Sequence, residues 1–126
     1  MLYIYWYLKR FYGLMGDTDK RSPTSEGEIT KNGYIMAHYA QYATETTRIK
    51  AVTNNEEVCA TAYWDEKTGE VTIVLLNLNG ASQWLEIPLA GIKKASAVET
   101  ERNKNMEVID TGLMESAEGN NGVVIC

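Results

Sequence analysis

The hydrophobic pattern of the chain changes character near residue 45. Before that point, residues 2–7 are apolar on both faces of a predicted strand, which is typical of a strand buried in a parallel sheet. A short helix is expected over about residues 8–15, and a polar loop with Gly, Pro and Ser follows over residues 16–27. Thr30 is a good N-cap for a second helix that should end near Thr44.

The second helix has one apolar face at helical spacing, and His38 falls on the opposite, polar side. The face consists of Ile35, Met36, Tyr39, Ala40, Tyr42 and Ala43. We expect this helix to fold back on the strands that follow it, because burial of such a face stabilises a helix.

After residue 45 the period changes to that of strands. Short strands are predicted over residues 46–53, 57–64, 70–78, 83–89, 95–100, 106–109 and 122–125. Their turn signals recur about every ten residues, which favours an antiparallel β-sandwich over residues 45–126. The strand at 70–78 is apolar on both faces and should be central. The last predicted strand ends with the chain, so we expect the sandwich to be truncated there.

Two tryptophans have different expected positions in the sandwich. Trp64 alternates in phase with Val58, Ala60 and Ala62 and should pack between the sheets, whereas Trp84 is out of phase with Leu85 and should be partly exposed.

Composition excludes several classes of function. The 126 residues are 44% hydrophobic and 23% charged, which is typical of a globular chain with about one core. The formal net charge of −5 argues against a nucleic-acid partner, which needs a basic face. No segment approaches the length of a transmembrane helix, so no membrane partner is expected. Residues 2–8 are not expected to be a signal peptide, because their cations follow the apolar run.

The remaining reactive side chains predict no metal and no cofactor. Cys59 and Cys126 give no ligand spacing and no disulfide framework, and Cys59 should be a small buried hydrophobe. His38 is expected to be a surface or hydrogen-bonded histidine. Asp17 and Asp19 should be solvated turn residues, because the spaced oxygen ligands of a calcium loop are missing.

Aromatic residues beside a cation form the candidate site. Trp6, Tyr7, Arg10 and Tyr12 follow the first predicted strand, at the end where parallel α/β sheets bind ligands. Aromatic rings can stack on a sugar face, and a guanidinium can bind a carboxylate with two hydrogen bonds. This set suits an acidic sugar; the alternative is that the rings are simply core.

Two segments resemble the end of the catalytic barrel in glycoside hydrolase family 30, in its bacterial glucuronoxylanase branch. They are Tyr5-Trp-Tyr-Leu-Lys-Arg-Phe-Tyr-Gly13 and Gly27-Glu-Ile-Thr-Lys-Asn-Gly-Tyr-Ile-Met-Ala-His-Tyr-Ala-Gln-Tyr42. The resemblance implies that residues 1–44 are the last strand and helices of a (β/α)₈ barrel, and that residues 45–126 are the sandwich side domain.

The same resemblance implies a function. Members of the family are retaining enzymes that cleave the β-1,4-xylan backbone of glucuronoxylan, and the family implies a secreted or periplasmic location, which the chain itself does not indicate. Trp6, Tyr7, Arg10 and Tyr12 match the residues that bind the glucuronate branch. The two catalytic glutamates of the family match no residue here, so the chain alone should be inactive and should need the missing barrel portion.

Three positions depart from the family pattern. Lys9 falls where the family often has Arg, Phe11 where it often has Ser, and Glu45 where a flexible residue such as Gly is expected. Two other interpretations stay open. One is an independent carbohydrate-binding module that uses exposed aromatics such as Trp84, and the other is a structural sandwich without a ligand.

Overall fold

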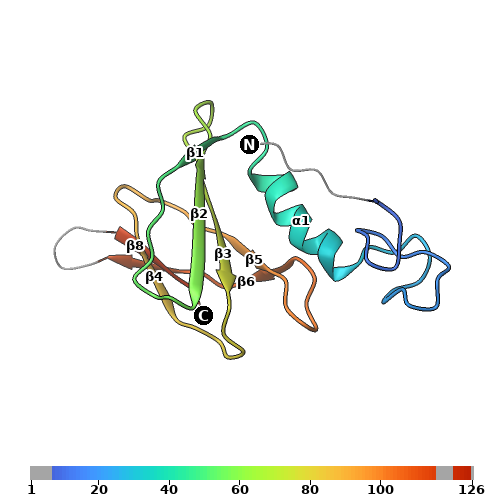
Figure 1. The fold of residues 1–126 in the computed structure, drawn as a ribbon. Coiled ribbons are helices and arrows are strands. Elements are labelled where there is room, and N and C mark those ends of the chain that lie inside the picture. The colour runs from blue at the N-terminus through green and yellow to red at the C-terminus, as the bar shows by residue number, and fades with distance from the viewer. Residues whose placement is uncertain (1–6, 116–120, 126) are drawn as a thin grey trace.

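The structure, a computed structural model, describes residues 7–115 and 121–125. These residues form one helix and eight strands (Figure 1). In order they are α1 (Lys31–Tyr42), β1 (Thr47–Ile49), β2 (Val58–Trp64), β3 (Val71–Asn77), β4 (Leu85–Pro88), β5 (Ala97–Glu99), β6 (Glu107–Ile109), β7 (Gly112–Glu115) and β8 (Asn121–Ile125). The prediction of a mainly β chain is confirmed.

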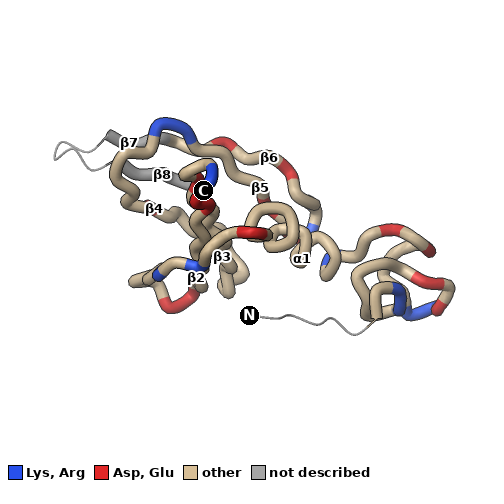
Figure 2. The backbone as a smooth tube through the Cα atoms, turned by 90° about the horizontal axis from the view of Figure 1, so that it is seen from above, with Lys and Arg blue, Asp and Glu red and all other residues tan. Residues whose placement is uncertain are grey.

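All strand pairs between these elements are antiparallel. The strands form three sheets, with the orders β1-β2-β3, β4-β8-β7 and β5-β6. Figures 1 and 2 show the first sheet on one side of the molecule and the other two sheets on the opposite side. Every predicted strand after residue 45 has a counterpart, and β7 is an additional strand that the sequence pattern did not indicate.

The prediction of a central strand at residues 70–78 was wrong. β3 is an edge strand, and β2 lies in the middle of its sheet. The register pairs Val58 with Asn77 and Trp64 with Val71. β3 is connected to β2 through the tight loop at Asp65–Gly69, where Gly69 has a left-handed φ of 76°. A strand that is apolar on both faces therefore does not have to have neighbours on both edges.

The core is small. Among the described side chains, Val58 and Ala62 of β2 are the buried hydrophobic ones, at 2% and 5% exposure. The chain has 9631 Å² of accessible surface, against roughly 6,700 Å² for a compact monomer of this mass. Trp64 was expected between the sheets, but it is 41% exposed, because it lies at the end of β2 beyond that core. Cys59 is exposed, which contradicts its predicted burial.

α1 begins where the sequence predicts. Thr30 is its N-cap: the Thr30 hydroxyl accepts a hydrogen bond from the Gly33 amide. Gly33 also allows close packing of the first turn, since a Cβ there would lie 2.4 Å from the Leu14 carbonyl oxygen. The helix ends at Tyr42, two residues before the predicted end.

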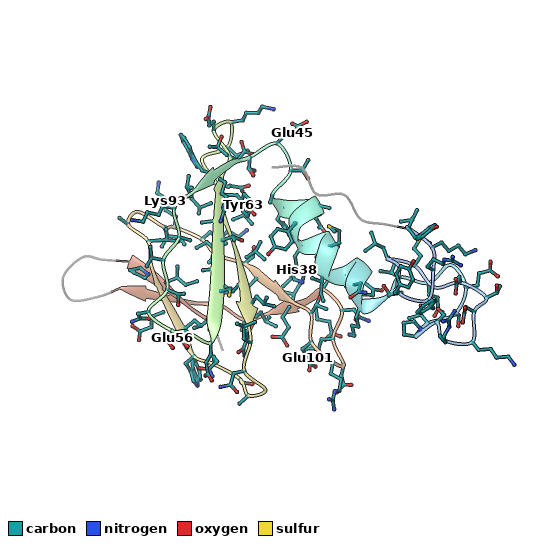
Figure 3. All side chains as sticks on the ribbon, in the orientation of Figure 1. His38, Glu45, Glu56, Tyr63, Lys93 and Glu101 are labelled. Atoms are coloured by element: carbon teal, nitrogen blue, oxygen red, sulfur yellow. The ribbon has the colours of Figure 1, made fainter. Side chains whose placement is uncertain are left out.

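The predicted apolar face of α1 is not its buried face. Ile35, Tyr39 and Tyr42 are 50%, 37% and 37% exposed, whereas His38 lies half-buried on the side toward the strands (Figure 3). The helix does fold back on the strands, as expected, and Lys31 and His38 hydrogen-bond across this contact. The ring of Tyr39, on this exposed face, contacts the ring of Tyr63 in β2, with 6.4 Å between the centroids.

The predicted helix at residues 8–15 was wrong. That segment is an irregular loop closed by non-local bonds: the Met15 amide bonds to the Leu8 carbonyl at 2.9 Å, and Met15 also forms bridges with Lys9 and Ile29. A helix would need each amide to bond four residues back, and here the amides bond across the loop. The strand predicted at residues 2–7 lies outside the described residues except for Tyr7.

Candidate functional site

Three of the four predicted site residues lie together on the loop before α1. The guanidinium carbon of Arg10 lies over the Tyr7 ring, 5.0 Å from its centroid. The Tyr7 and Tyr12 rings meet edge to face, with centroids 6.3 Å apart and planes at 70°. Trp6, the fourth residue, lies outside the described residues. The sequence therefore predicted the grouping of Tyr7, Arg10 and Tyr12.

All three side chains face solvent to a large extent. Tyr7 is 45% and Tyr12 is 40% exposed, and Arg10 is exposed as well. Tyr7 has a positive φ of 68°, a backbone conformation that is uncommon for a residue with a side chain and that clusters at functional sites. The rings are thus not core residues within the part of the chain that the structure describes.

The loop is shaped by a tight turn under these side chains. The Gly13 amide bonds to the Arg10 carbonyl at 2.8 Å, which closes residues 10–13. A Cβ on Gly13 would lie 2.8 Å from both the Arg10 nitrogen and the Leu8 carbonyl oxygen. Only glycine fits here without displacing the backbone, so Gly13 keeps Arg10 and Tyr12 on one compact turn.

Thr30 ties this turn to the helix. Its side chain is the most completely buried one described, at 2% exposure. The Thr30 hydroxyl donates to the Gly13 carbonyl at 2.7 Å and its amide donates to the Leu14 carbonyl at 3.0 Å. Since the same hydroxyl caps α1 by accepting from Gly33, one side chain joins the helix start to the site loop.

A second cation and ring extend the group. The guanidinium carbon of Arg21 lies 3.8 Å from the centroid of the Phe11 ring. Phe11 in turn meets Tyr12 edge to face at 4.7 Å. We call the contact series Arg21, Phe11, Tyr12, Tyr7 and Arg10 the cation–aromatic chain. Phe11 was expected only as a departure from a family pattern, and Arg21 was not predicted. The available signal for Arg21 was Asp19, two residues earlier in the sequence.

Arg21 is held by a carboxylate. Its Nε and Nη2 donate to the two oxygens of Asp19 at 3.0 and 2.7 Å, and its backbone amide also donates to Asp19 at 2.9 Å. These hydrogen bonds hold the pKa of Asp19 far below its usual range and raise the pKa of Arg21. Asp17 accepts from the Asp19 amide at 3.0 Å. Both aspartates are therefore bonded within the loop.

Arg10 has a different electrostatic setting. The ion pairs of this loop, within the described residues, are those of Lys9 with Glu26 and of Arg21 with Asp19, so Arg10 is in neither. Figure 2 shows basic and acidic positions intermingled along the loop. Arg10 contributes only a weak long-range lowering of the pKa of Asp19. Its guanidinium carbon lies over the Tyr7 ring face, and a cation in this position is attracted by the ring.

This arrangement can bind a planar anion beside a ring. The guanidinium carbon of Arg10 lies over the Tyr7 ring, and a guanidinium can donate two parallel hydrogen bonds to both oxygens of a carboxylate. The Tyr7 and Tyr12 rings form a corner beside it, and a ring surface can pack on the C–H groups of a sugar. Where the structure describes the chain, no cluster of His, Cys, Asp or Glu could hold a metal ion.

A second polar group joins α1 to the β5–β6 hairpin. The Lys31 ammonium donates to the carbonyls of Glu101 and Lys104 at 2.6 and 2.8 Å, and to the side-chain oxygen of Asn105. His38 Nε2 lies 2.9 Å from the Thr100 hydroxyl, as expected of a hydrogen-bonded histidine. Partial burial lowers the pKa of His38, which favours the neutral ring. Figure 3 shows His38 and Glu101 on facing elements.

Two further features lie on the strands. A shallow depression of about 290 Å³ lies between the end of β1 and the facing part of β2. It is lined by Arg48, Ile49, Lys50, Ala51, Ala60 and Thr61. Trp84, before β4, is 73% exposed, which confirms its predicted exposure. The helix that the structure describes is neither long nor apolar enough to cross a membrane.

Comparison with known proteins gives a partial match. No family model matches the chain. It is 35% identical over 79 residues, or 61% of its length, to Glucuronoxylanase XynC of Bacillus subtilis, and 35% identical over 77 residues to the protein of the same name from strain 168. The match spans 16% of the length of each relative. The chain is therefore related in sequence to a small part of two glucuronoxylanases.

Proposed function

We propose that this chain is part of a retaining glycoside hydrolase of family 30 that cleaves the β-1,4-xylan backbone of glucuronoxylan. In this proposal Trp6, Tyr7, Arg10 and Tyr12 contribute to the subsite for the glucuronate branch. The sequence similarity to two glucuronoxylanases supports the polysaccharide class. The observation that carries the subsite is the guanidinium of Arg10 over Tyr7, beside the Tyr12 ring.

The geometry of the loop supports recognition of the branch. A glucuronate presents a planar carboxylate on a sugar ring, so it needs a two-pronged donor and an apolar surface next to each other. The edge of the Arg10 guanidinium supplies two parallel donors, and a tyrosine ring supplies the surface. A neutral xylose unit satisfies only the second requirement, and the site therefore discriminates by charge.

The rest of the chain supports this loop in the proposal. Residues 1–44 belong to the barrel, and residues 45–126 form the sandwich side domain that braces it. Thr30 links the site loop to α1 by its bond to Gly13, and Lys31 links α1 to the β5–β6 hairpin. The catalytic glutamate pair is contributed by another portion of the barrel, so this chain positions substrate and does not hydrolyse it.

Binding by the purified chain tests the subsite. Ligand-observed NMR, which detects millimolar affinities, compares a xylo-oligosaccharide that carries one glucuronate branch with the unbranched oligosaccharide. We expect the acidic ligand to bind more tightly. Arg10→Lys should weaken its binding about three- to tenfold, because an ammonium keeps the charge but cannot make the fork.

A matched control is Arg102→Lys, an exposed arginine of the β5–β6 hairpin. It should bind like the unchanged chain. Equal affinity for acidic and neutral ligands, or an Arg10→Lys variant that binds normally, would rule out the subsite.

Hydrolysis is tested separately. The chain alone should release no reducing ends from glucuronoxylan above a heat-treated blank, because a retaining enzyme needs two carboxylates about 5 Å apart on either side of the scissile bond. Clear release of reducing ends would overturn the proposal that another portion of the barrel contributes the catalytic glutamates.

An independent carbohydrate-binding module is the second candidate function. Its support is Trp84, whose 73% exposure suits a stacking platform for a neutral sugar. This function predicts that Trp84→Ala removes binding of the unbranched oligosaccharide while Arg10→Lys leaves it intact. Loss of acidic-ligand binding in Arg10→Lys, together with normal acidic-ligand binding in Trp84→Ala, favours the first proposal.

A further inference from the structure

We propose that Asp19 and Arg21 are positioning residues that hold Phe11, and that Phe11 fixes the Tyr12 ring for binding of the acidic sugar. This inference rests on the proposed function for the ligand, but its geometric part concerns the cation–aromatic chain alone. It assigns a role to three side chains outside the predicted site.

The first step is the fork between Asp19 and Arg21. Two side-chain hydrogen bonds of 3.0 and 2.7 Å fix the plane of the guanidinium. The Arg21 side chain is 66% exposed and that of Asp19 is 29% exposed. An exposed ion pair is usually worth little, but two-pronged geometry is the case in which it counts. A third bond, from the Arg21 amide, fixes the same carboxylate.

The second step is the stack on Phe11. The guanidinium carbon is 3.8 Å from the ring centroid, which is the separation of a face-on contact. A guanidinium oriented by a carboxylate on its edge offers its face to a ring at little further entropic cost. Phe11 is half-buried, so Arg21 covers one face of a ring that would otherwise be open to water.

The third step transfers the constraint to the site. Phe11 and Tyr12 are at 87° with centroids 4.7 Å apart, and Tyr12 then meets Tyr7 at 70°. A ring edge against a ring face is a preferred and directional arrangement. If Phe11 turned, Tyr12 would lose this neighbour, and the corner beside Arg10 would open.

The competing explanation for any effect of Arg21 is simple attraction between its positive charge and an acidic ligand. Lys20 separates the two explanations, because it is an exposed cation one residue away that does not belong to the cation–aromatic chain. Arg21→Lys also separates the two explanations, since it keeps the positive charge but loses the planar hydrogen-bonding fork and the stack on Phe11.

The experiment uses the full 126-residue chain with four substitutions: Arg21→Lys, Arg21→Gln, Phe11→Leu and Lys20→Gln. Backbone amide spectra first establish that each variant is folded. Tyr12 ring resonances then report the geometry without a ligand. The affinity for the branched acidic oligosaccharide is measured by ligand-observed NMR.

We expect Arg21→Lys, Arg21→Gln and Phe11→Leu to move the Tyr12 resonances and to weaken acidic binding about two- to fivefold. Lys20→Gln should change neither readout. Normal affinity of Arg21→Lys, with equal losses of affinity in Arg21→Gln and Lys20→Gln, would mean that Arg21 acts only by attracting the acidic ligand with its charge. That result would overturn the inference.

Failure of the proposed function has a different signature. If the unchanged chain binds no acidic sugar while the Tyr12 resonances move as expected, the ligand assignment fails and the positioning of Tyr12 stands. Tyr12 resonances that stay in place in both Arg21→Lys and Phe11→Leu overturn the positioning, whatever the ligand does.

Discussion

Replacement of Thr30 by alanine should destabilise both the helix and the site loop. The Thr30 hydroxyl accepts from the Gly33 amide at 3.2 Å and donates to the Gly13 carbonyl at 2.7 Å. Loss of an N-cap costs about 1 kcal/mol, and leaving a carbonyl such as that of buried Gly13 unpaired costs about 1 kcal/mol more. Thr30→Ala should therefore lower the free energy of unfolding by about 2 kcal/mol.

The assay is urea unfolding followed by far-ultraviolet circular dichroism, with Thr30→Ser as the matched variant. Serine keeps both hydrogen bonds and removes one methyl group, so its cost should stay below about 1 kcal/mol. Amide hydrogen exchange adds local resolution. The Gly33 amide should exchange faster in Thr30→Ala than in Thr30→Ser, because it loses its acceptor.

Equal destabilisation by the two substitutions would refute this reasoning, since the methyl group and not the hydroxyl would then be responsible. A Thr30→Ala variant within about 0.5 kcal/mol of the unchanged chain would refute it as well, because a buried cap with two partners is outside the range of neutral surface changes.

Three further predictions concern residues around α1. Glu45 has a left-handed φ of 60°, so Glu45→Gly should raise the free energy of unfolding by about 0.5–1 kcal/mol in urea titrations, and unchanged or lower stability would contradict this. Burial lowers the pKa of His38 below its ordinary 6.5, so the unfolded chain binds more protons than the folded chain at lower pH. The free energy of unfolding should therefore be highest above about pH 6.5 and fall as the pH decreases below that value. The free energy of unfolding should differ less between pH 7.5 and pH 5 in His38→Gln than in the unchanged chain. An equal difference in the two proteins would refute the assignment to His38. Lys31→Met removes three hydrogen bonds from the Lys31 ammonium to the β5–β6 hairpin, so the hairpin amides should exchange severalfold faster, with the amides of β2 as the internal control. Unaltered exchange in the hairpin would show that these hydrogen bonds do not hold it.

Local signals in the sequence predicted most elements but not their surroundings. The strands after residue 45 could be predicted because alternation and turn residues are local signals. In β4, for example, Leu85 and Ile87 are half-buried, whereas Glu86 and Pro88 are exposed. β7 was missed because Gly112-Leu-Met-Glu115 has neither alternation nor β-branched residues.

The errors came from interactions that are distant in sequence. The segment at residues 8–15 has apolar residues at helical spacing, but its amides bond across the loop, for example that of Met15 to Leu8. The face of α1 was assigned by hydrophobicity, yet the partner elements select His38 and Lys31 by hydrogen bonds. Periodicity shows that an element has two faces, and only the tertiary partners decide which one is covered.

The candidate site divides in the same way. Tyr7, Arg10 and Tyr12 are so close in sequence that a tight turn brings them together, and their grouping could be predicted. Arg21 reaches Phe11 across the loop, and nothing in the spacing of these two residues indicates that contact. The supporting residues of a site are harder to predict than the site itself, because their contacts depend on the path of the loop.

Adjacent residues at the start of α1 bond in opposite directions, and this connects the site to the strands. Thr30 bonds to Gly13 below the site loop, whereas Lys31 bonds to the carbonyls of the β5–β6 hairpin. A rotation or shift of the first helical turn would therefore strain both attachments at once. Because backbone geometry within one capped turn is stiff, the hairpin and the loop that holds Arg10 should keep a fixed separation, so that the strands can serve as the support against which the site loop is held.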